Sequence, residues 1–141
     1  MLYDPMLVQP MRDELTRLGV RELRSAEEVE EAIGDASGTT LIVVNSVCGC
    51  AARNARPAVA IALEHNTQPD RVVTVFAGQD IEATARARGY FTGYRPSSPS
   101  MGLLRDGELV FMLERHQIEG READDIARDL AGAFDQFCVA A

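Results

Sequence analysis

Three segments of the 141-residue chain have the hydrophobic pattern of β-strands. Residues 39–44 and 71–76 are short, continuous apolar runs rich in β-branched residues, a pattern typical of strands buried on both faces of a parallel sheet. Residues 20–23 alternate in polarity, as a short strand at the edge of a sheet does. The chain therefore contains at least three predicted strands before residue 80.

Apolar residues at helical spacing predict five helices, at residues 10–18, 26–33, 51–63, 80–88 and 122–137. Pro10 and Gly19 mark the expected start and end of the first helix. Ser25 with Glu28 forms a capping box that predicts the start of the second. Pro57 lies inside the third helix and should kink it, because proline has no backbone amide hydrogen to donate.

Two further strands are predicted on either side of Asp106-Gly107, because an Asp-Gly pair between the apolar runs 103–104 and 109–113 favours a tight hairpin. After the first helix, strands and helices follow one another in the order β-α-β-α-β-α-β-β-α. This order predicts an α/β fold with a central mixed sheet flanked by helices on both faces. No linker, repeat or low-complexity segment divides the chain, so we expect residues 1–141 to form a single domain.

Charge narrows the classes of partner. Fourteen basic residues against twenty-two acidic ones give a net charge of −8, which opposes binding to nucleic acid or to an anionic membrane surface. No apolar run approaches the roughly 18 residues of a membrane-spanning helix. The first residues lack the basic region of a signal peptide, and acid and proline interrupt their apolar run. We therefore expect a cytoplasmic location, where thiols are kept reduced and closely spaced cysteines are more often catalytic or metal-binding than structural.

The most informative segment is Cys48-Gly49-Cys50, which lies between the predicted strand 39–44 and the predicted helix 51–63. At such a junction, unpaired amide groups and the helix dipole stabilise an anion, and here that anion would be a thiolate. Gly49 allows the turn to be tight. A disulfide across one residue closes a smaller ring than Cys-x-x-Cys, and strain makes it easier to reduce. We therefore predict a labile, oxidising redox pair that needs no cofactor.

Two other interpretations use the same residues. Both cysteines behave as inert small hydrophobic residues in the first. In the second, Cys48 and Cys50, with Cys138 or a histidine, supply soft ligands for zinc or copper(I). Only two cysteines are close in sequence, however, and there is no second Cys-x-x-Cys and no His-x-His. We therefore favour redox chemistry over metal binding.

The element order, the thiols at a helix start and a proline ahead of the Asp-Gly hairpin resemble the thioredoxin fold. In that fold a cis-proline lies eight residues before the hairpin glycine, which corresponds to Ser98-Pro99 counted back from Gly107. The segment from Asn45 to Ala52 and the segment 134–138, Phe-Asp-Gln-Phe-Cys, resemble more closely the bacilliredoxins, small bacterial thioredoxin-like proteins with Cys-Gly-Cys sites. The likeness covers nearly the whole chain.

This resemblance implies a thiol-disulfide oxidoreductase that removes bacillithiol from mixed disulfides on client proteins, with disulfide reductase or isomerase activity as a further expectation. The implied partners are bacillithiol or another low-molecular-weight thiol, and the thiol-modified clients. Cys48 matches the attacking nucleophile and Cys50 the resolving thiol. Gly49, Ser98 and Pro99 match the residues that border the substrate.

The sequence departs from thioredoxins at two positions. Val47 replaces the aromatic residue usual before the first cysteine. Ile42 occupies the strand position at which thioredoxins keep a buried acid. The sequence therefore offers no evident carboxylate to accept the proton of Cys50.

Among the other residues with reactive or charged side chains, five are candidates for a role at the site. We expect His65, at the end of the active-site helix, and His116, after the hairpin, to be surface histidines rather than ligands. Arg53 and Arg56 are candidates for holding a thiolate or an anionic thiol, but solvated helix arginines are the expectation. Cys138 is expected to be a semi-buried structural residue, with a redox role as the alternative.

Overall fold

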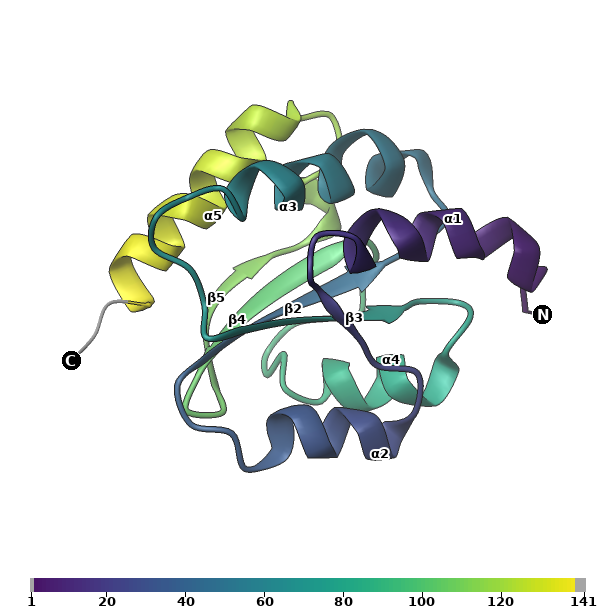
Figure 1. Ribbon diagram of the computed structural model, residues 1–141, viewed down its shortest axis with the longest axis horizontal. Helices are drawn as coiled ribbons and strands as arrows, with labels where there is room; N and C mark the ends of the chain where they lie inside the picture. Colours follow the sequence, from purple (N-terminus) through teal and green to yellow (C-terminus); the bar gives the residue numbers. More distant parts are fainter. Residues whose placement is uncertain (1, 139–141) are drawn as a thin grey trace.

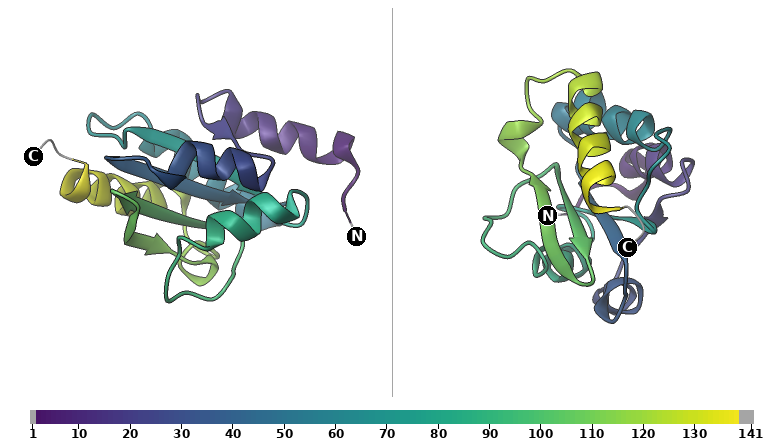
Figure 2. Two further views of the ribbon diagram at one scale, coloured as in Figure 1. Left: turned by 90° about the horizontal axis from the view of Figure 1, so that it is seen from below. Right: turned by 90° about the vertical axis from the view of Figure 1, so that its left-hand side faces the viewer.

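The computed structural model describes residues 2–138, in which a mixed sheet lies between two layers of helices (Figures 1 and 2). The helices of one layer are α1 (Pro5–Thr16), α3 (Arg56–Ala62) and α5 (Ala123–Phe137). The helices of the other layer are α2 (Ala26–Val29) and α4 (Ile81–Arg88). The predicted α/β fold with helices on both faces of a mixed sheet is thus confirmed.

The sheet contains five strands in the order β1-β3-β2-β4-β5. Their bounds are β1 (Arg21–Glu22), β2 (Thr39–Asn45), β3 (Arg71–Phe76), β4 (Ser100–Arg105) and β5 (Glu108–Leu113). β3 is parallel to β1 and β2, whereas β4 is antiparallel to β2 and β5. In register, Ile42 lies opposite both Val73 and Gly102. Every residue of β2 is buried, as predicted, although one of its two neighbours is antiparallel.

Alternating side chains of β2 fill two separate apolar clusters, one on each face of the sheet. Leu41 and Val43 pack in the cluster below α3 and α5, which includes Phe134. Ile42 and Val44 pack in the cluster formed with α2 and α4. Because helices cover both faces, the strand is apolar throughout its centre instead of alternating, which explains the continuous run in the sequence.

The helix that follows the cysteines starts with a widened turn, η2 (Ala51–Ala55), and continues as α3. Pro57 lies in the first turn of α3 and has no amide hydrogen for the regular helical ladder. The expected interruption therefore takes the form of a π-type turn just ahead of the proline. A second widened turn, η1 (Glu30–Gly34), extends α2 to the predicted stop at Gly34.

The predicted capping box before α2 is present in a slightly shifted form. Ser25 Oγ accepts a hydrogen bond from the amide of Glu28 at 3.1 Å. The Glu28 carboxylate accepts from the amide of Arg24 at 2.6 Å, one residue before the cap. Both side chains therefore satisfy amide groups at the helix start, as the sequence pattern indicated.

The predicted start of the first helix at Pro10 is wrong, because α1 begins at Pro5 and includes Pro10. Asp4 is the N-cap, and its carboxylate accepts from the amide of Met6 at 2.9 Å. Proline at the first helical position leaves no amide unpaired. The Asp4-Pro5 pair is therefore a helix start, although in the sequence it resembles an interruption.

The hairpin between β4 and β5 is as predicted. Asp106 has φ 51° and Gly107 has φ 83°, the two positive values that a type I′ turn requires. At the other end of β4, the Ser98–Pro99 peptide bond is cis, which confirms the expected isomer.

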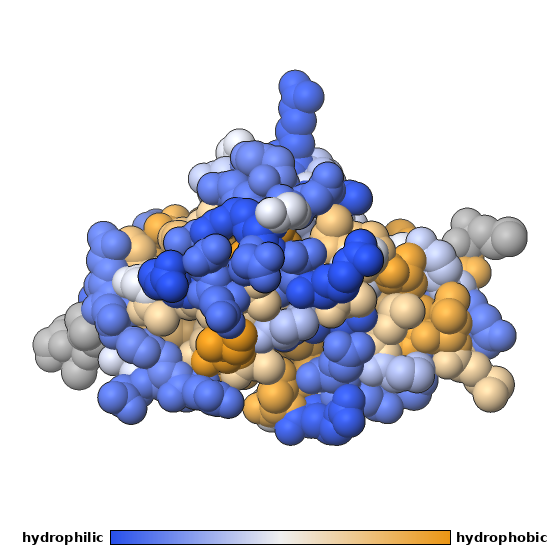
Figure 3. All heavy atoms as spheres, turned by 90° about the horizontal axis from the view of Figure 1, so that it is seen from above, coloured by the Kyte–Doolittle hydropathy of each residue, from blue (hydrophilic) through white to orange (hydrophobic). Residues whose placement is uncertain are grey.

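Figure 3 views the molecule from the side of α1, α3 and α5, where hydrophilic residues cover much of the surface. Apolar residues gather at the right-hand end, over the beginning of α1. There Leu2, Met6 and Leu7 are 60%, 83% and 52% exposed. No helix within residues 2–138 is both long and apolar enough to cross a membrane.

Candidate active site

Cys48 lies just beyond the carboxyl end of β2, where the chain turns into the η2–α3 helix. The amides of Ala51 and Ala52 donate to the Cys48 carbonyl at 3.0 and 3.2 Å, so the first helical turn closes on this residue. Cys50 immediately precedes η2. Both are free thiols and both are half-buried. Their position between β2 and η2 confirms the predicted placement at a strand-to-helix junction.

The Cys48 sulfur is surrounded by hydrogen-bond donors. Ser46 Oγ lies 3.3 Å from Cys48 Sγ. Burial favours the protonated thiol, but hydrogen bonds from the Ser46 hydroxyl, from the amides of Ala51 and Cys50 and from the Cys50 thiol outweigh it. Together they hold the pKa of Cys48 below its usual value. This shift favours the thiolate form of Cys48 at the helix start.

Cys50 has the opposite environment, because its thiol faces a carboxylate. Its Sγ lies 3.5 Å from Glu119 Oε2. Burial, the charge of Cys48 and the contact with Glu119 raise the pKa of Cys50. The pKa values of these two thiols, which one residue separates, are therefore shifted in opposite directions: that of Cys48 is lowered and that of Cys50 is raised.

Glu119 and Arg115 belong to the segment between β5 and α5, in and just after the short helix η3 (Arg115–Gln117). Arg115 Nε donates to Glu119 Oε2 at 2.8 Å, and Arg115 Nη2 lies 4.0 Å from Cys50 Sγ. The Arg115 contact lowers the pKa of Glu119. The sequence interpretation missed this carboxylate, since it lies 69 residues from Cys50. The available signal was an acid four residues after an arginine, directly beyond the hairpin.

Arg56 is buried, at 3% exposure, which corrects the expectation of a solvated arginine. Its Nη1 donates to Asn45 Oδ1 and to the Ser46 carbonyl, both at 2.9 Å. Its Nε forms an ion pair with Glu14 at 3.2 Å, without an aligned hydrogen bond. Arg56 thereby fixes the backbone that leads from β2 to Cys48. Arg53 is exposed, as expected.

The backbone ahead of the cis bond is held by arginines. Arg115 Nη1 donates to the Ser98 carbonyl at 3.4 Å, and Arg88 Nη2 donates to the Ser97 carbonyl at 3.2 Å. A cavity of about 300 Å³ adjoins this segment and Cys48. It is lined by Tyr3, Ser46, Val47, Cys48, Ala77, Gly78, Arg88, Ser98 and Arg115.

Of the residues predicted to border the substrate, Ser98 lines this cavity together with Cys48. Pro99 is buried and Gly49 is exposed, and neither is among the residues that line the cavity. Gly49 is not among the described glycines with positive φ. A Cβ on Gly49 would meet only the flexible end of Arg53, at 2.7 Å from Nη2. The turn therefore does not depend on glycine's access to left-handed backbone.

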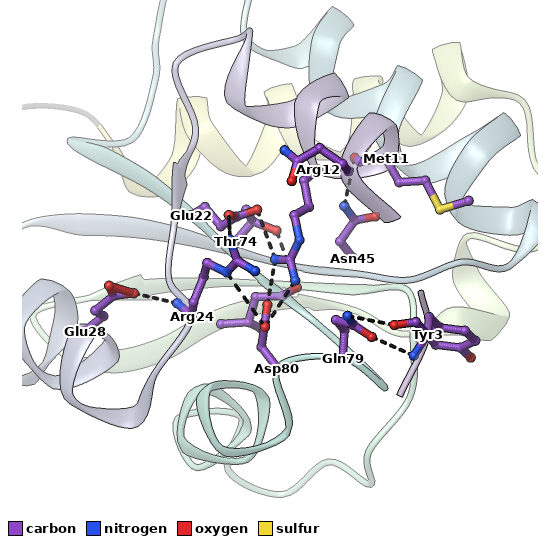
Figure 4. Close-up of polar contacts among 12 residues, drawn as sticks. Tyr3, Met11, Arg12, Glu22, Arg24, Glu28, Asn45, Thr74, Gln79 and Asp80 are labelled. Atoms are coloured by element: carbon purple, nitrogen blue, oxygen red, sulfur yellow. Dashed lines mark hydrogen bonds and ion pairs between the residues drawn. The ribbon is translucent and has the colours of Figure 1, made fainter. Parts of the chain in front are cut away.

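Tyr3, from the N-terminal segment, lines the cavity. Figure 4 shows its contact with Gln79. Gln79 pins Tyr3 at both backbone groups, accepting from its amide at 2.8 Å and donating to its carbonyl at 3.1 Å. Beside this contact, Arg12 is 1% exposed and forms a two-pronged bond to Asp80, at 2.7 and 3.1 Å. Figure 4 shows how Arg12 reaches from α1 to Asp80, so that α1 is fixed against the start of α4.

The remaining candidates lie elsewhere. His65 pairs with Asp135 at 2.8 Å, between the end of α3 and α5, and His116 is exposed, as expected. Cys138 is half-buried beside Thr39, at the start of β2, and therefore at the other end of the strand from Cys48. Within residues 2–138 no group of three or more histidine, cysteine or acidic side chains is arranged to hold a metal ion.

Solved structures share the fold. A putative oxidoreductase with a thioredoxin fold superposes with a TM-score of 0.57 and 15% identity, covering 82% of this chain and 93% of that one. The thioredoxin of Fasciola hepatica superposes with a TM-score of 0.56 and 18% identity, covering 84% of this chain and 99% of the other. At this identity the likeness shows the fold alone, which is that of thioredoxin.

Sequence relatives define the class more closely. Residues 3–138 match the protein family described as disulphide isomerase. A bacilliredoxin of Koribacter versatilis is 56% identical over 139 residues, covering 99% of this chain and 96% of its own length. A bacilliredoxin of Geobacillus kaustophilus is 55% identical over 137 residues, with coverage of 96% and 94%. With the thioredoxin fold, these relatives define a thiol-disulfide oxidoreductase. The chain belongs to the bacilliredoxin family.

Proposed function

We propose that this protein removes bacillithiol from mixed disulfides on client proteins, with Cys48 as nucleophile and Cys50 as resolving thiol. The observation that carries the proposal is the opposite pKa shift of the two neighbouring thiols, lowered for Cys48 and raised for Cys50. Exchange needs one thiolate to attack and a second thiol that stays protonated until the adduct has been transferred. The names of the relatives support the small-thiol substrate.

In the first step, the Cys48 thiolate attacks the sulfur of the small thiol in the mixed disulfide. The client's sulfur leaves with the electron pair of the broken bond and takes up a proton. Cys48 then carries the small thiol as a new mixed disulfide, and the client is free. The lowered pKa of Cys48 increases the fraction of attacking thiolate at a given pH.

In the second step, Cys50 loses its proton and attacks the Cys48 sulfur. Glu119, 3.5 Å from Cys50 Sγ, is the proposed proton acceptor. A Cys48–Cys50 disulfide forms, and the small thiol leaves with the electron pair of the broken bond. The pair has then given two electrons to the mixed disulfide, so two external thiols, or one dithiol, must supply two electrons and be oxidised to a disulfide before the next cycle.

Ser98, Pro99 and Gly49 are proposed to border the substrate. Ser98 lines the same cavity as Cys48 and directly precedes the cis bond, and its backbone is proposed to contact an incoming peptide. Gly49 is exposed between the two sulfurs, so no side chain of its own covers them. Disulfide reductase or isomerase activity would use the same attack by Cys48 on a protein disulfide, in line with the description of the matched family. No observation favours a metal-binding function.

The test is turnover on one client protein that carries either bacillithiol or glutathione as its mixed disulfide. We expect faster release of bacillithiol, complete dependence on Cys48 and no loss in a Cys138→Ala control. Equal rates for the two adducts would overturn the bacillithiol assignment while leaving the oxidoreductase class intact.

A further inference from the structure

The cavity beside Cys48 is cationic, although the protein as a whole has a net charge of −8. Apart from the Cys48 thiol itself, Arg88 and Arg115 are the only ionisable side chains with a charge at neutral pH among the described residues that line it. A volume of about 300 Å³ is at the lower end of the range for small-molecule sites. The local field therefore favours a small anion at the place where a thiol adduct would meet Cys48.

Arg88 is the more informative of the two arginines, because its charge has no ion-pair partner within residues 2–138. Its Nη2 donates to the Ser97 carbonyl. Its Nε is buried and has no hydrogen-bond partner among residues 2–138. Burial lowers the pKa of Arg88, but a guanidinium remains charged at neutral pH. A buried, unpaired donor is costly, and an incoming acceptor would relieve that cost.

Three other arginines, on α4, on α1 and at the cavity, are paired with carboxylates. Arg86, two residues earlier on α4, pairs with Glu30 at 2.8 Å. Arg12 is bound by Asp80, and Arg115 by Glu119 at 2.8 Å. Arg88 therefore differs from these three arginines because it lines the cavity that contains Cys48 and has no ion-pair partner within residues 2–138.

We propose that Arg88, with Arg115, binds a carboxylate of the low-molecular-weight thiol while Cys48 attacks its sulfur. The ligand class is a small thiol that carries at least one carboxylate, and the inference rests on the proposed removal of such a thiol from a client. Guanidinium groups bind carboxylates through paired, charge-assisted hydrogen bonds, which give orientation as well as affinity. Arg88 acts on the small thiol and not on the client, so its effect depends on the adduct alone.

The experiment uses one single-cysteine client protein carrying either N-acetylcysteine or N-acetylcysteamine as a mixed disulfide. The two adducts differ by one carboxylate. The measured quantity is the ratio of the second-order rate constants for release of the client thiol, anionic adduct over neutral adduct. We expect Arg88→Gln to lower that ratio about tenfold, the scale of one charge-assisted contact. Added salt should lower the wild-type ratio as well.

Two variants serve as controls. Arg86→Gln removes the same charge from the same helix and should leave the ratio unchanged. Arg88→Lys keeps the charge and should retain part of the preference, even if loss of the Ser97 contact lowers both rates. The ratio is insensitive to a general loss of folded protein, because both adducts are attacked by the same preparation.

The outcomes separate the two proposals. If wild-type protein releases neither adduct, the proposed removal of small thiols fails. If it releases both and Arg88→Gln leaves the ratio unchanged, the carboxylate site is overturned while the oxidoreductase proposal stands. Equal slowing of both adducts would assign Arg88 to positioning the Ser97–Ser98 backbone, and this result too would overturn the site.

Discussion

Cys48 and Cys138 lie near opposite ends of β2, and both are half-buried free thiols. Burial alone would raise the pKa of each, and for Cys138 it does, despite a hydrogen bond with Thr39. For Cys48, the Ser46 hydroxyl and the amides of the helix start reverse that effect. The comparison shows that donors at the strand-to-helix junction, and not exposure, account for the lowered pKa of one of the two cysteines.

The largest expected difference between Cys48 and Cys138 is in the attack on the mixed disulfide. Cys48→Ala should reduce removal of the adduct to the uncatalysed rate, since no other described thiol faces the cavity. Cys138→Ala should leave the rate within about twofold of wild type, as expected away from a functional site. Release of the client thiol measures both. An inactive Cys138→Ala protein with an intact fold would contradict the division of roles.

The next prediction separates the two thiols of the pair. Cys50→Ala should strip the client once and remain trapped, because no neighbouring thiol can displace the adduct from Cys48. Intact-mass spectrometry should show a gain equal to the mass of the small thiol. Excess small thiol should restore some multiple turnover, with almost none in its absence. If Cys48→Ala gained that mass instead, the two roles would have to be exchanged.

Removing the Ser46 hydroxyl, which donates to the Cys48 sulfur, should reduce the difference in pKa between Cys48 and Cys138. Ser46→Ala deletes the hydroxyl 3.3 Å from Cys48 Sγ and should raise the pKa of Cys48 by about one unit, since a hydrogen bond to a charged group is worth roughly 1.5 kcal/mol or more. Thiolate forms as pH rises, so the alkylation profile should shift to higher pH. Cys138 in the same protein is the internal control. An unchanged Cys48 profile would assign the shift to the backbone amides alone.

Glu119→Gln should produce a smaller effect that is confined to Cys50. Loss of the carboxylate should lower the pKa of Cys50, because Glu119 helps to raise it. If Glu119 also accepts the proton, resolution at neutral pH should nevertheless slow several-fold, which is less than the roughly hundredfold effect of an effective general base, because Arg115 lowers the pKa of Glu119 and makes it a weak base. Glu114→Gln, on the same segment, is the matched control. Faster resolution together with the lower pKa would rule out the acceptor role.

Local patterns predicted most of the fold. The run 39–44 is apolar because helices cover both faces of β2, and the Asp106-Gly107 turn follows from backbone conformations that few residues adopt. The cysteine pair could be placed because its neighbours in sequence are also its neighbours in space. The helix start at Asp4 was missed, since a capping acid followed by proline also resembles a loop.

The parts that escaped prediction depend on distant contacts. Arg56 is buried because Asn45 and Glu14, from a strand and another helix, receive its charge. Glu119 reaches Cys50 from beyond the hairpin, and Arg88 reaches the cavity from α4. No spacing along the chain encodes such approaches, since they follow from the way in which the helices and loops pack around the sheet.

The position of Tyr3 affects where the protein can be tagged or shortened. Its backbone is clasped by Gln79, and its ring stands over Gly78 at one wall of the reaction cavity. The beginning of α1 and the end of α5 lie on opposite sides of the molecule (Figure 1). An affinity tag fused ahead of Tyr3, or trimming of the first few residues, would therefore alter the mouth of the active site. The same tag after α5 would leave it open.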